Sequence, residues 1–333
     1  MTRTEIDQLL ASLPQGKLVE THISWLLLAG NLVFKIKKPV KFSFLDFSTL
    51  EKRQFYCHRE VLLNRRFTRN IYLDVVPIVQ QEDRPALEKH DGPVIDFAVK
   101  MHRMDDTRYM TTLLENHLVS ANQVAQIAKK LAAFHRLAER IPEPPDTSWW
   151  LKQFKDVRQV IGFLSENLED NPGEVIDQAI RVVENRLSRL APRILQRYRD
   201  GFYIDGHGDL HSGNIFLLDE PVFFDCIEFN DKFRHLDVLD EMAFFCLDLD
   251  YYKQPELEDL FLKHYQEHYP CFIREEDQQL YLLFKCYRAN VKLKVQSLKA
   301  LQASNPDERR HRLQRAFKYY QLFKRYSHML QKG

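Results

Sequence analysis

The hydrophobic pattern of this chain changes once along its length, and that change constrains the fold more than any other feature. Up to about residue 103 most apolar residues are spaced as in β-strands. Beyond it helical periodicity prevails, over roughly 112–139, 148–168, 174–199, 234–252, 255–268, 274–302 and 306–330. Only the segment 201–229 interrupts these helices with β-type sequence. This order predicts an α+β protein in which a small sheet with one main helix is followed by a larger helical part.

Two short signals in the first part locate a turn and a helix. Gly30-Asn31 lies between two apolar runs, which is typical of a two-residue β-hairpin. A helix is expected to begin after Ser48 or Thr49, because either side chain can accept a hydrogen bond from the first helical turn. Two more strands are expected at 71–80 and 94–101, where β-branched and aromatic residues are frequent.

The composition argues against several classes of protein. The 333 residues are 44% hydrophobic and 29% charged with a formal net charge of +1, so the whole chain has no electrostatic preference for nucleic acid or an anionic membrane. The five cysteines are scattered without a CxxC pair, which favours a reducing compartment over disulfides or a zinc site. No stretch approaches 18 apolar residues, and the first residues lack a secretion signal. We expect a soluble cytoplasmic protein.

The β-type segment contains the residues HGDLHSGN at 207–214, followed by an aspartate at 225. Phosphoryl transfer from ATP needs a carboxylate beside the acceptor hydroxyl, oxygen ligands for Mg²⁺, a lysine on the phosphates and a glutamate that holds this lysine. Asp209 precedes Asn214 by five residues, at the other end of one tight loop. A turn at 219–221 then reverses the chain and returns Asp225 beside Asn214. The side-chain oxygens of Asn214 and Asp225 can therefore converge on one metal ion.

This loop resembles the HxDxxxxN catalytic loop of the aminoglycoside phosphotransferase and choline kinase families, which have a protein-kinase-like fold. With the segments VETHISWLLLAGNLVFKIKK, LNRR and FFDCIEFN, it makes the chain similar to the phosphotransferase half of bacterial two-part proteins in which a P-loop kinase-type domain follows. This chain contains no GxxxxGKS/T motif. The resemblance implies a bilobal fold: an N-lobe at 1–103 that binds nucleotide phosphates, and a helical C-lobe at 104–333 with the catalytic loop and the acceptor site.

The resemblance also assigns the residues of the catalytic loop. It implies an ATP- and Mg²⁺-dependent phosphotransferase that moves the γ-phosphate to a hydroxyl of a small molecule. Asp209 would be the catalytic base, and Asn214 and Asp225 would bind Mg²⁺.

Lys35, at the end of the LVFK strand, occupies the position of the lysine that grips the phosphates. Glu60, in the following helix, is the best match for its ion-pair partner, with Glu51 as a rival. Lys37 points to the same face of the strand as Lys35 and could substitute for it.

For the nucleotide, the resemblance implies that backbone groups from about Lys100 to Arg103, including Met101, meet adenine. The chain has no GxGxxG motif to cover the phosphates, and Ser24 in the turn 21–24 is the candidate for that position.

Two further acidic residues, Glu228 and Asp240, are candidates for roles around the metal and the loop. Asp225 is followed by Cys226-Ile227-Glu228 without a Phe-Gly pair, which argues against a flipping switch of the protein-kinase type. Glu228 could lie near the metal or be structural. Asp240 matches an aspartate that braces the catalytic loop in the family.

Other interpretations stay open at this point. A pseudokinase would bind nucleotide without turnover, and a protein kinase or nucleotidyl transferase would use the same fold differently. The acceptor cannot be derived from the sequence. The segment 285–332 carries 13 Lys and Arg and only two acidic residues, which indicates either solvated helix faces or a surface for an anionic partner or acceptor.

Overall fold

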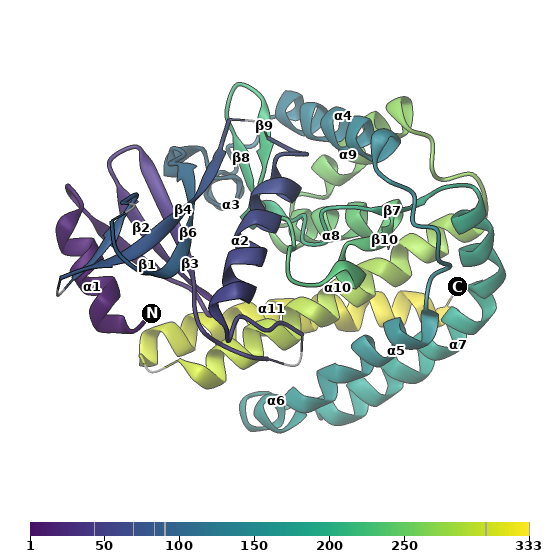
Figure 1. Cartoon of the computed structure of the whole chain (residues 1–333). Helices are drawn as coiled ribbons and strands as arrows, with labels where there is room; N and C mark the ends of the chain where they lie inside the picture. The colour runs from purple at the N-terminus through teal and green to yellow at the C-terminus, as the bar shows by residue number, and fades with distance from the viewer. Residues whose placement is uncertain (43, 69, 83, 90, 304, 333) are drawn as a thin grey trace. The chain divides into compact units, whose positions relative to one another are not determined.

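The structure is a computed structural model that describes residues 1–42, 44–68, 70–82, 84–89, 91–303 and 305–332 (Figure 1). The chain divides into two compact units. The first consists of Met1–Asn116, His207–Asp209 and Gly213–Arg234, and the second of His117–Gly206, Leu210–Ser212 and His235–Gly333. Most of the β-type segment at 201–229 thus belongs to the same unit as the N-terminal residues.

Six antiparallel strands form the sheet of the first unit, in the order β1-β2-β3-β6-β4-β5. Their bounds are Lys17–Glu20 (β1), Ser24–Ala29 (β2), Leu32–Lys37 (β3), Tyr72–Gln81 (β4), Arg84–Leu87 (β5) and Val94–His102 (β6). Gly30 and Asn31 connect β2 to β3 as the predicted hairpin, because Ala29 pairs with Leu32. The sequence did not predict β5, which is short and contains a proline.

Helices cover both faces of this sheet. Phe34 and Ile36 of β3 belong to the core cluster formed with α1 (Arg3–Ser12). Val33 of β3 belongs to the cluster formed with Cys57 and Val61 of α2 (Leu50–Asn64). Since side chains alternate along a strand, the odd-numbered positions of β3 face α2. The lysines at positions 35 and 37 are therefore directed toward this helix.

Short elements complete the first unit. They are η1 (Asp106–Arg108), α3 (Met110–Glu115), the hairpin of β8 (Ile215–Leu217) and β9 (Pro221–Phe223), and η4 (Asp231–Phe233). Tyr109 forms a β-bridge with Phe216 of the hairpin, and Arg108 donates to the Leu217 carbonyl at 2.7 Å. These contacts hold the hairpin within the first unit.

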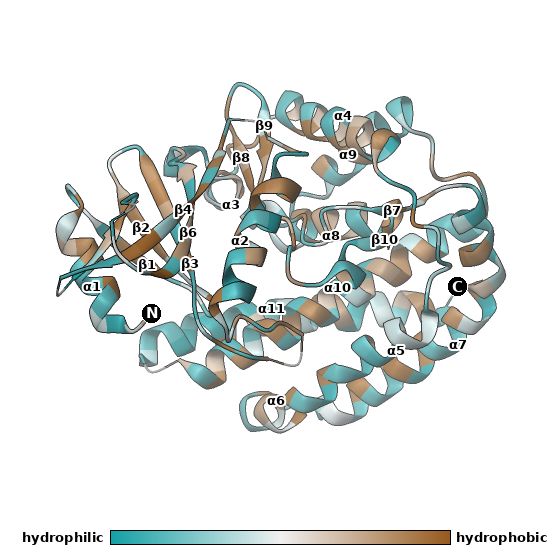
Figure 2. Ribbon diagram, in the orientation of Figure 1, coloured by the Kyte–Doolittle hydropathy of each residue, from teal (hydrophilic) through white to brown (hydrophobic). Residues whose placement is uncertain are grey.

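The second unit is mostly helical. It contains α4 (Ala121–Leu137), α5 (Thr147–Lys155), η2 (Asp156–Val160), α6 (Ile161–Asn167), α7 (Pro172–Arg199), α8 (Val238–Tyr251), α9 (Pro255–His268), α10 (Glu275–Gln302) and α11 (Pro306–Lys332), with β7 (Tyr203–Asp205) paired to β10 (His235–Asp237). Figure 2 shows hydrophobic and hydrophilic residues alternating along α7, as expected for a helix with one buried side. Within the described ranges, no helix is long and apolar enough to cross a membrane.

Two helices predicted as continuous are interrupted, so those two predictions were wrong. The predicted helix 112–139 is α3 followed by α4, because Ser120 starts a new helix through a capping box with Gln123. His117 between them has φ 55°, which ends α3. The predicted helix 148–168 is α5 and α6 with the 3₁₀ turn η2 between them. Hydrophobic periodicity continues through such breaks and therefore did not reveal them.

Candidate active site

Strand β3 presents two lysines to α2. The Lys35 Nζ atom lies 2.7 Å from Glu60 Oε1 and 2.6 Å from Asp225 Oδ1. The Lys37 Nζ atom lies 2.6 Å from Glu60 Oε2 and also donates to Glu228 Oε1. The two oxygens of Glu60 thus bind different lysines, and the five charged side chains form one network.

The local sequence of α2 places Glu60 in this network. The side chain of Thr49 accepts a hydrogen bond from the first turn and fixes where the helix begins. Cys57, Glu60 and Asn64 are buried, and their spacing of three and four residues puts them on one face. Glu51, the rival candidate, is exposed in the first turn.

The electrostatics of the network keep its central groups charged. Burial opposes the positive charge of Lys35, but Asp225 and Glu60 outweigh burial and raise the pKa of Lys35 well above its ordinary value. Burial also opposes ionisation of Glu60, yet Lys35 and Lys37 lower its pKa from 4.5 to about 2. For Glu228 the effect of burial prevails and raises the pKa of its carboxyl group.

Asp225 has an uncommon backbone conformation, with φ 60° in the left-handed region. Aspartate is among the few residue types that adopt this region readily. The Tyr72 hydroxyl accepts a hydrogen bond from the Asp225 N–H at 3.0 Å, and Asn64 Oδ1 accepts one from the Cys226 N–H at 2.9 Å. The sequence did not single out Tyr72 or Asn64 for this turn.

The residues of the loop at 207–214 that belong to the first unit are hydrogen-bonded to one another and to Phe224, next to the turn at Asp225. Asn214 Nδ2 donates to the Asp209 carbonyl at 2.9 Å and to Asp209 Oδ2 at 3.1 Å. His207 Nε2 lies 2.9 Å from the Phe224 carbonyl, and the Phe224 N–H donates to the Asn214 carbonyl at 3.1 Å. Phe224 directly precedes Asp225, so the structure brings Asp209, Asn214 and Asp225 together.

The other predicted site residues lie at the ends of strands. Ser24 begins β2 opposite Lys37, and its buried hydroxyl has no hydrogen-bond partner within the described part of the chain. Met101 is buried near the end of β6. Arg103 follows β6, and its N–H donates to the Asn31 carbonyl at 2.8 Å. Contacts of these three residues with a nucleotide stay predictions.

A sequence profile of the Phosphotransferase enzyme family matches residues 66–272, which include the catalytic loop and Asp225. The chain belongs to this family. Uncharacterized proteins of Mycobacterium tuberculosis (strain ATCC 25618 / H37Rv) and Mycobacterium bovis are each 30% identical to it over 297 residues, which are 84% of this chain and 54% of the relative. The chain thus spans about half the length of the curated relatives it matches.

Solved structures confirm the predicted fold. A choline/ethanolamine kinase family protein from Mesorhizobium loti superimposes with a TM-score of 0.53 at 14% identity, over 100% of both chains. A choline kinase from Cryptosporidium parvum Iowa II gives 0.53 at 12% identity, over 93% of this chain and 89% of that one. The GDP complex of aminoglycoside 2'-phosphotransferase-IIIa gives 0.50 at 11% identity, over 96% and 99%. The chain has the protein-kinase-like α+β fold of these enzymes.

The oxygen atoms of the candidate site fit Mg²⁺ as ligands. Asn214 donates through its amide nitrogen, so its amide oxygen is the atom suited to a cation. The Asp225 side chain is 45% exposed and supplies a carboxylate. In the part of the chain that the structure describes, no group of three or more His, Cys, Asp or Glu side chains is arranged to hold a metal. A smaller set fits Mg²⁺, which commonly takes its other ligands from water and substrate phosphates.

The second unit contains the remaining loop residues, Leu210–Ser212. Ser212 donates to Asp248 of α8 through its N–H at 3.0 Å and its hydroxyl at 2.6 Å. His211 Nδ1 lies 3.8 Å from the same carboxylate. Asp240, the expected brace of the loop, forms a buried ion pair with Arg288 at 2.6 Å and 2.9 Å. The contacts to residues 211 and 212 thus come from Asp248.

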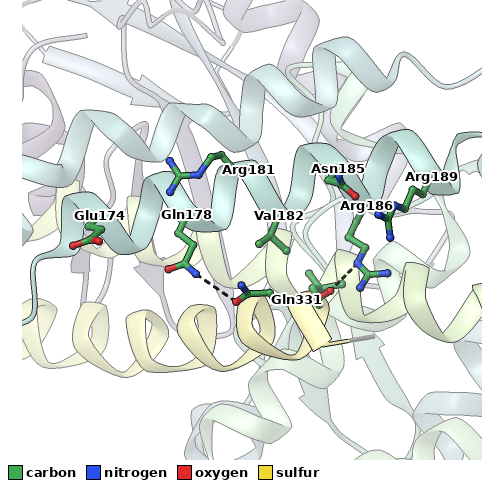
Figure 3. A pocket seen from close by; sticks show the side chains of 9 residues that line it. Glu174, Gln178, Arg181, Val182, Asn185, Arg186, Arg189 and Gln331 are labelled. Atoms are coloured by element: carbon green, nitrogen blue, oxygen red, sulfur yellow. Dashed lines mark hydrogen bonds between the residues drawn. The ribbon is translucent and has the colours of Figure 1, made fainter.

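A separate open pocket of the second unit lies between α7 and the end of α11 (Figure 3). Arg181, Arg186 and Arg189 of α7 line it, and Arg186 Nε donates to the Leu330 carbonyl at 2.7 Å. The pocket contains none of the predicted site residues.

Proposed function

We propose that this chain transfers the γ-phosphate of ATP to a hydroxyl group of a small molecule, with Asp209 as the catalytic base. One observation carries the proposal. Lys35 contacts both Glu60 and Asp225, while Asp209 is hydrogen-bonded to Asn214 through its carboxylate. A phosphate-binding lysine and a hydroxyl-orienting carboxylate are the main protein groups that phosphoryl transfer requires.

In the proposed reaction, the acceptor hydroxyl oxygen forms a bond to the γ-phosphorus, the bond to the β–γ bridging oxygen breaks, and ADP leaves. Asp209 orients the hydroxyl and takes its proton. Asn214 holds one oxygen of this carboxylate and so fixes its direction. The Lys35 ammonium binds phosphate oxygens, and Glu60 keeps it in place.

Asn214 and Asp225 would hold Mg²⁺, which when bound neutralises negative charge on the phosphates. The carboxylate of Asp225 is directed at Lys35 in the structure and is partly exposed, so it is accessible to a cation.

Nucleotide binding is proposed at the end of β6, with Met101 and Arg103 near the base. One structural neighbour is a GDP complex of aminoglycoside 2'-phosphotransferase-IIIa, which supports nucleotide binding as such and leaves the assignment of Met101 and Arg103 to the resemblance. The kinds of acceptor named for the neighbours, choline and ethanolamine, support a small molecule with a hydroxyl group.

The substitution Asp209→Asn tests the proposal. We expect phosphoryl transfer to fall by roughly 10²- to 10⁴-fold, the usual contribution of a general base, while ADP binding is retained. The measurement is ATP consumption across a panel of hydroxyl-bearing metabolites, with product masses to show whether a phosphate or a nucleotide is added.

The control is Asp219→Asn. Asp219 is exposed and lies in the turn between β8 and β9, the hairpin that follows the loop of Asp209. The substitution should leave turnover unchanged. Equal turnover in wild type and Asp209→Asn would remove the base assignment. ADP binding without ATP consumption on any acceptor would favour a pseudokinase.

A further inference from the structure

The second lysine of β3 is more deeply buried than the first. The Lys37 side chain is 0% exposed, and its two partners Glu60 and Glu228 are 0% and 5% exposed. Charged groups are buried this completely only when they are paired. The sequence placed Lys37 as a possible substitute for Lys35, but its position gives it a different set of contacts.

The contacts of Lys37 close a ring of ion pairs that includes Lys35 and Asp225. Two residues of β3, Lys35 and Lys37, bind Asp225 and Glu228, respectively. The lysines are two residues apart in the chain, and the carboxylates are three residues apart. Glu60 of α2 bridges the two lysines inside this ring. Three segments, β3, α2 and 225–228, are thereby fixed to one another.

We propose that Lys37 and Glu228 are positioning residues for the phosphoryl-transfer site, which hold Glu60 and the turn at Asp225 in the arrangement that receives Mg²⁺ and nucleotide. This inference rests on the proposed function. Phosphates and a cation compete for Lys35 and Asp225 as they bind, so the contact between these two side chains must loosen. The pair formed by Lys37 and Glu228 keeps Glu60 and the turn in place during this exchange.

The geometry also accounts for the sequence that follows Asp225. The turn at Asp225, whose φ is 60°, is held by hydrogen bonds from the Asp225 and Cys226 N–H groups to Tyr72 and Asn64. Glu228 anchors the segment on its C-terminal side by binding a buried lysine. The turn at Asp225 is thus contacted by Tyr72 and Asn64 and, through Glu228, by Lys37.

The test compares Lys37→Met, Glu228→Gln and the double variant with a buried ion pair outside the ring. Arg53 of α2 and Asp96 of β6 form such a pair at 2.9 Å, with side chains 7% and 0% exposed. Arg53→Met therefore removes a buried cation from the same helix and sheet without touching the ring. Each variant is measured below its melting temperature, checked by circular dichroism.

Two readouts separate positioning from general stability. Calorimetry gives the affinity for ADP with and without Mg²⁺, and ATP turnover is followed as a function of Mg²⁺ concentration. We expect the Lys37 and Glu228 variants to require about 10- to 100-fold more Mg²⁺ for half-maximal ADP binding and turnover, as is usual when partners of metal ligands are lost. Arg53→Met should lower the melting temperature but shift the Mg²⁺ requirement far less than the ring variants, and Lys37→Arg should recover part of the Mg²⁺ dependence.

The inference is overturned if the ring variants show the wild-type Mg²⁺ dependence, or shift it no more than Arg53→Met. If Lys37→Met does not fold, Glu228→Gln and the double variant decide, because neither leaves the buried Glu228 carboxylate without its lysine. A wild-type chain that binds no ADP and consumes no ATP would instead contradict the proposed function.

Discussion

At the scale of single residues, the candidate site depends on side chains that fix the position of neighbouring backbone and side-chain groups. Tyr72 and Asn64 bind the backbone on either side of Asp225, and Lys37 binds Glu60. Alternation along β3 pointed to Lys37, and LNRR, which contains Asn64, was among the matching segments. No feature of the sequence around Tyr72 or Asn64 indicated that these side chains would reach the turn at Asp225.

Gly208, in the loop at 207–214, has a backbone conformation and surroundings that leave no room for a side chain. Its φ is 84°, and an added Cβ would lie 2.7 Å from the Phe233 carbonyl oxygen. We predict that Gly208→Ala destabilises the protein by at least about 1–2 kcal/mol, the cost of a left-handed conformation for a residue with a Cβ. Turnover should fall as well, since Asp209 is the next residue.

The control for this prediction is Gly162 in α6. An added Cβ there has nothing within 4 Å, and alanine stabilises a helix by up to about 1 kcal/mol relative to glycine. Urea denaturation should give opposite signs for the two variants, and a stable Gly208→Ala would contradict the prediction.

At the scale of elements, α2 connects sheet packing to the site. Its apolar residues pack against β3, β4 and β6, and the same face carries Glu60. The start of this helix therefore controls where the Glu60 carboxylate lies.

The cap of α2 allows this connection to be tested. Thr49 Oγ1 accepts a hydrogen bond from the Lys52 N–H at 3.3 Å. We predict that Thr49→Ala lowers the free energy of unfolding by about 1 kcal/mol and weakens ADP binding, because α2 carries Glu60.

Thr2→Ala provides the comparison, because Thr2 caps α1 in the same way, on the other face of the sheet. It should cost similar stability but leave ADP affinity unchanged. If both variants alter ADP affinity equally, the role of α2 in positioning Glu60 is not supported.

At the scale of the whole molecule, ion pairs explain much of the basic character of the segment 285–332. Its lysines and arginines that form ion pairs are Lys285, Arg288, Lys294, Arg310, Arg312, Lys324 and Arg325. Lys285 alone contacts Asp250 and Glu258, each at 2.7 Å. At least seven of the 13 basic residues are thus paired with carboxylates, which weakens the interpretation as a surface for an anionic partner.

A buried ion pair of the second unit should govern stability in acid. Burial opposes ionisation of Asp277, but hydrogen bonds from Arg193 and the Arg274 N–H lower its pKa from 3.8 to about 2. Its stabilising contribution, up to about 2 kcal/mol, is present above the unfolded-state pKa and is lost as pH falls through the folded-state pKa.

We predict that Asp277→Asn loses this contribution. The difference in free energy of unfolding between wild type and variant should be constant near neutral pH and should shrink between pH 3.8 and about 2. Chemical denaturation at a series of pH values gives this difference, and a value that stays constant down to the lower limit would contradict the prediction.

The sequence by itself determined the features that depend on neighbouring residues: the Gly30-Asn31 hairpin, the cap of α2, the alternation that directs Lys35 and Lys37 to one face, and the chemistry of the loop at 207–214. Each is set by backbone preferences or side-chain spacing over a few positions.

Only the tertiary structure decided which carboxylates meet these lysines. Glu60 is 25 residues from Lys35, Asp225 is 190 residues from it, and Glu228 is 191 residues from Lys37. Sequence periodicity gives no information over such separations. Burial selected the pairs, because lysines excluded from water must be matched by carboxylates that the fold brings to the same place.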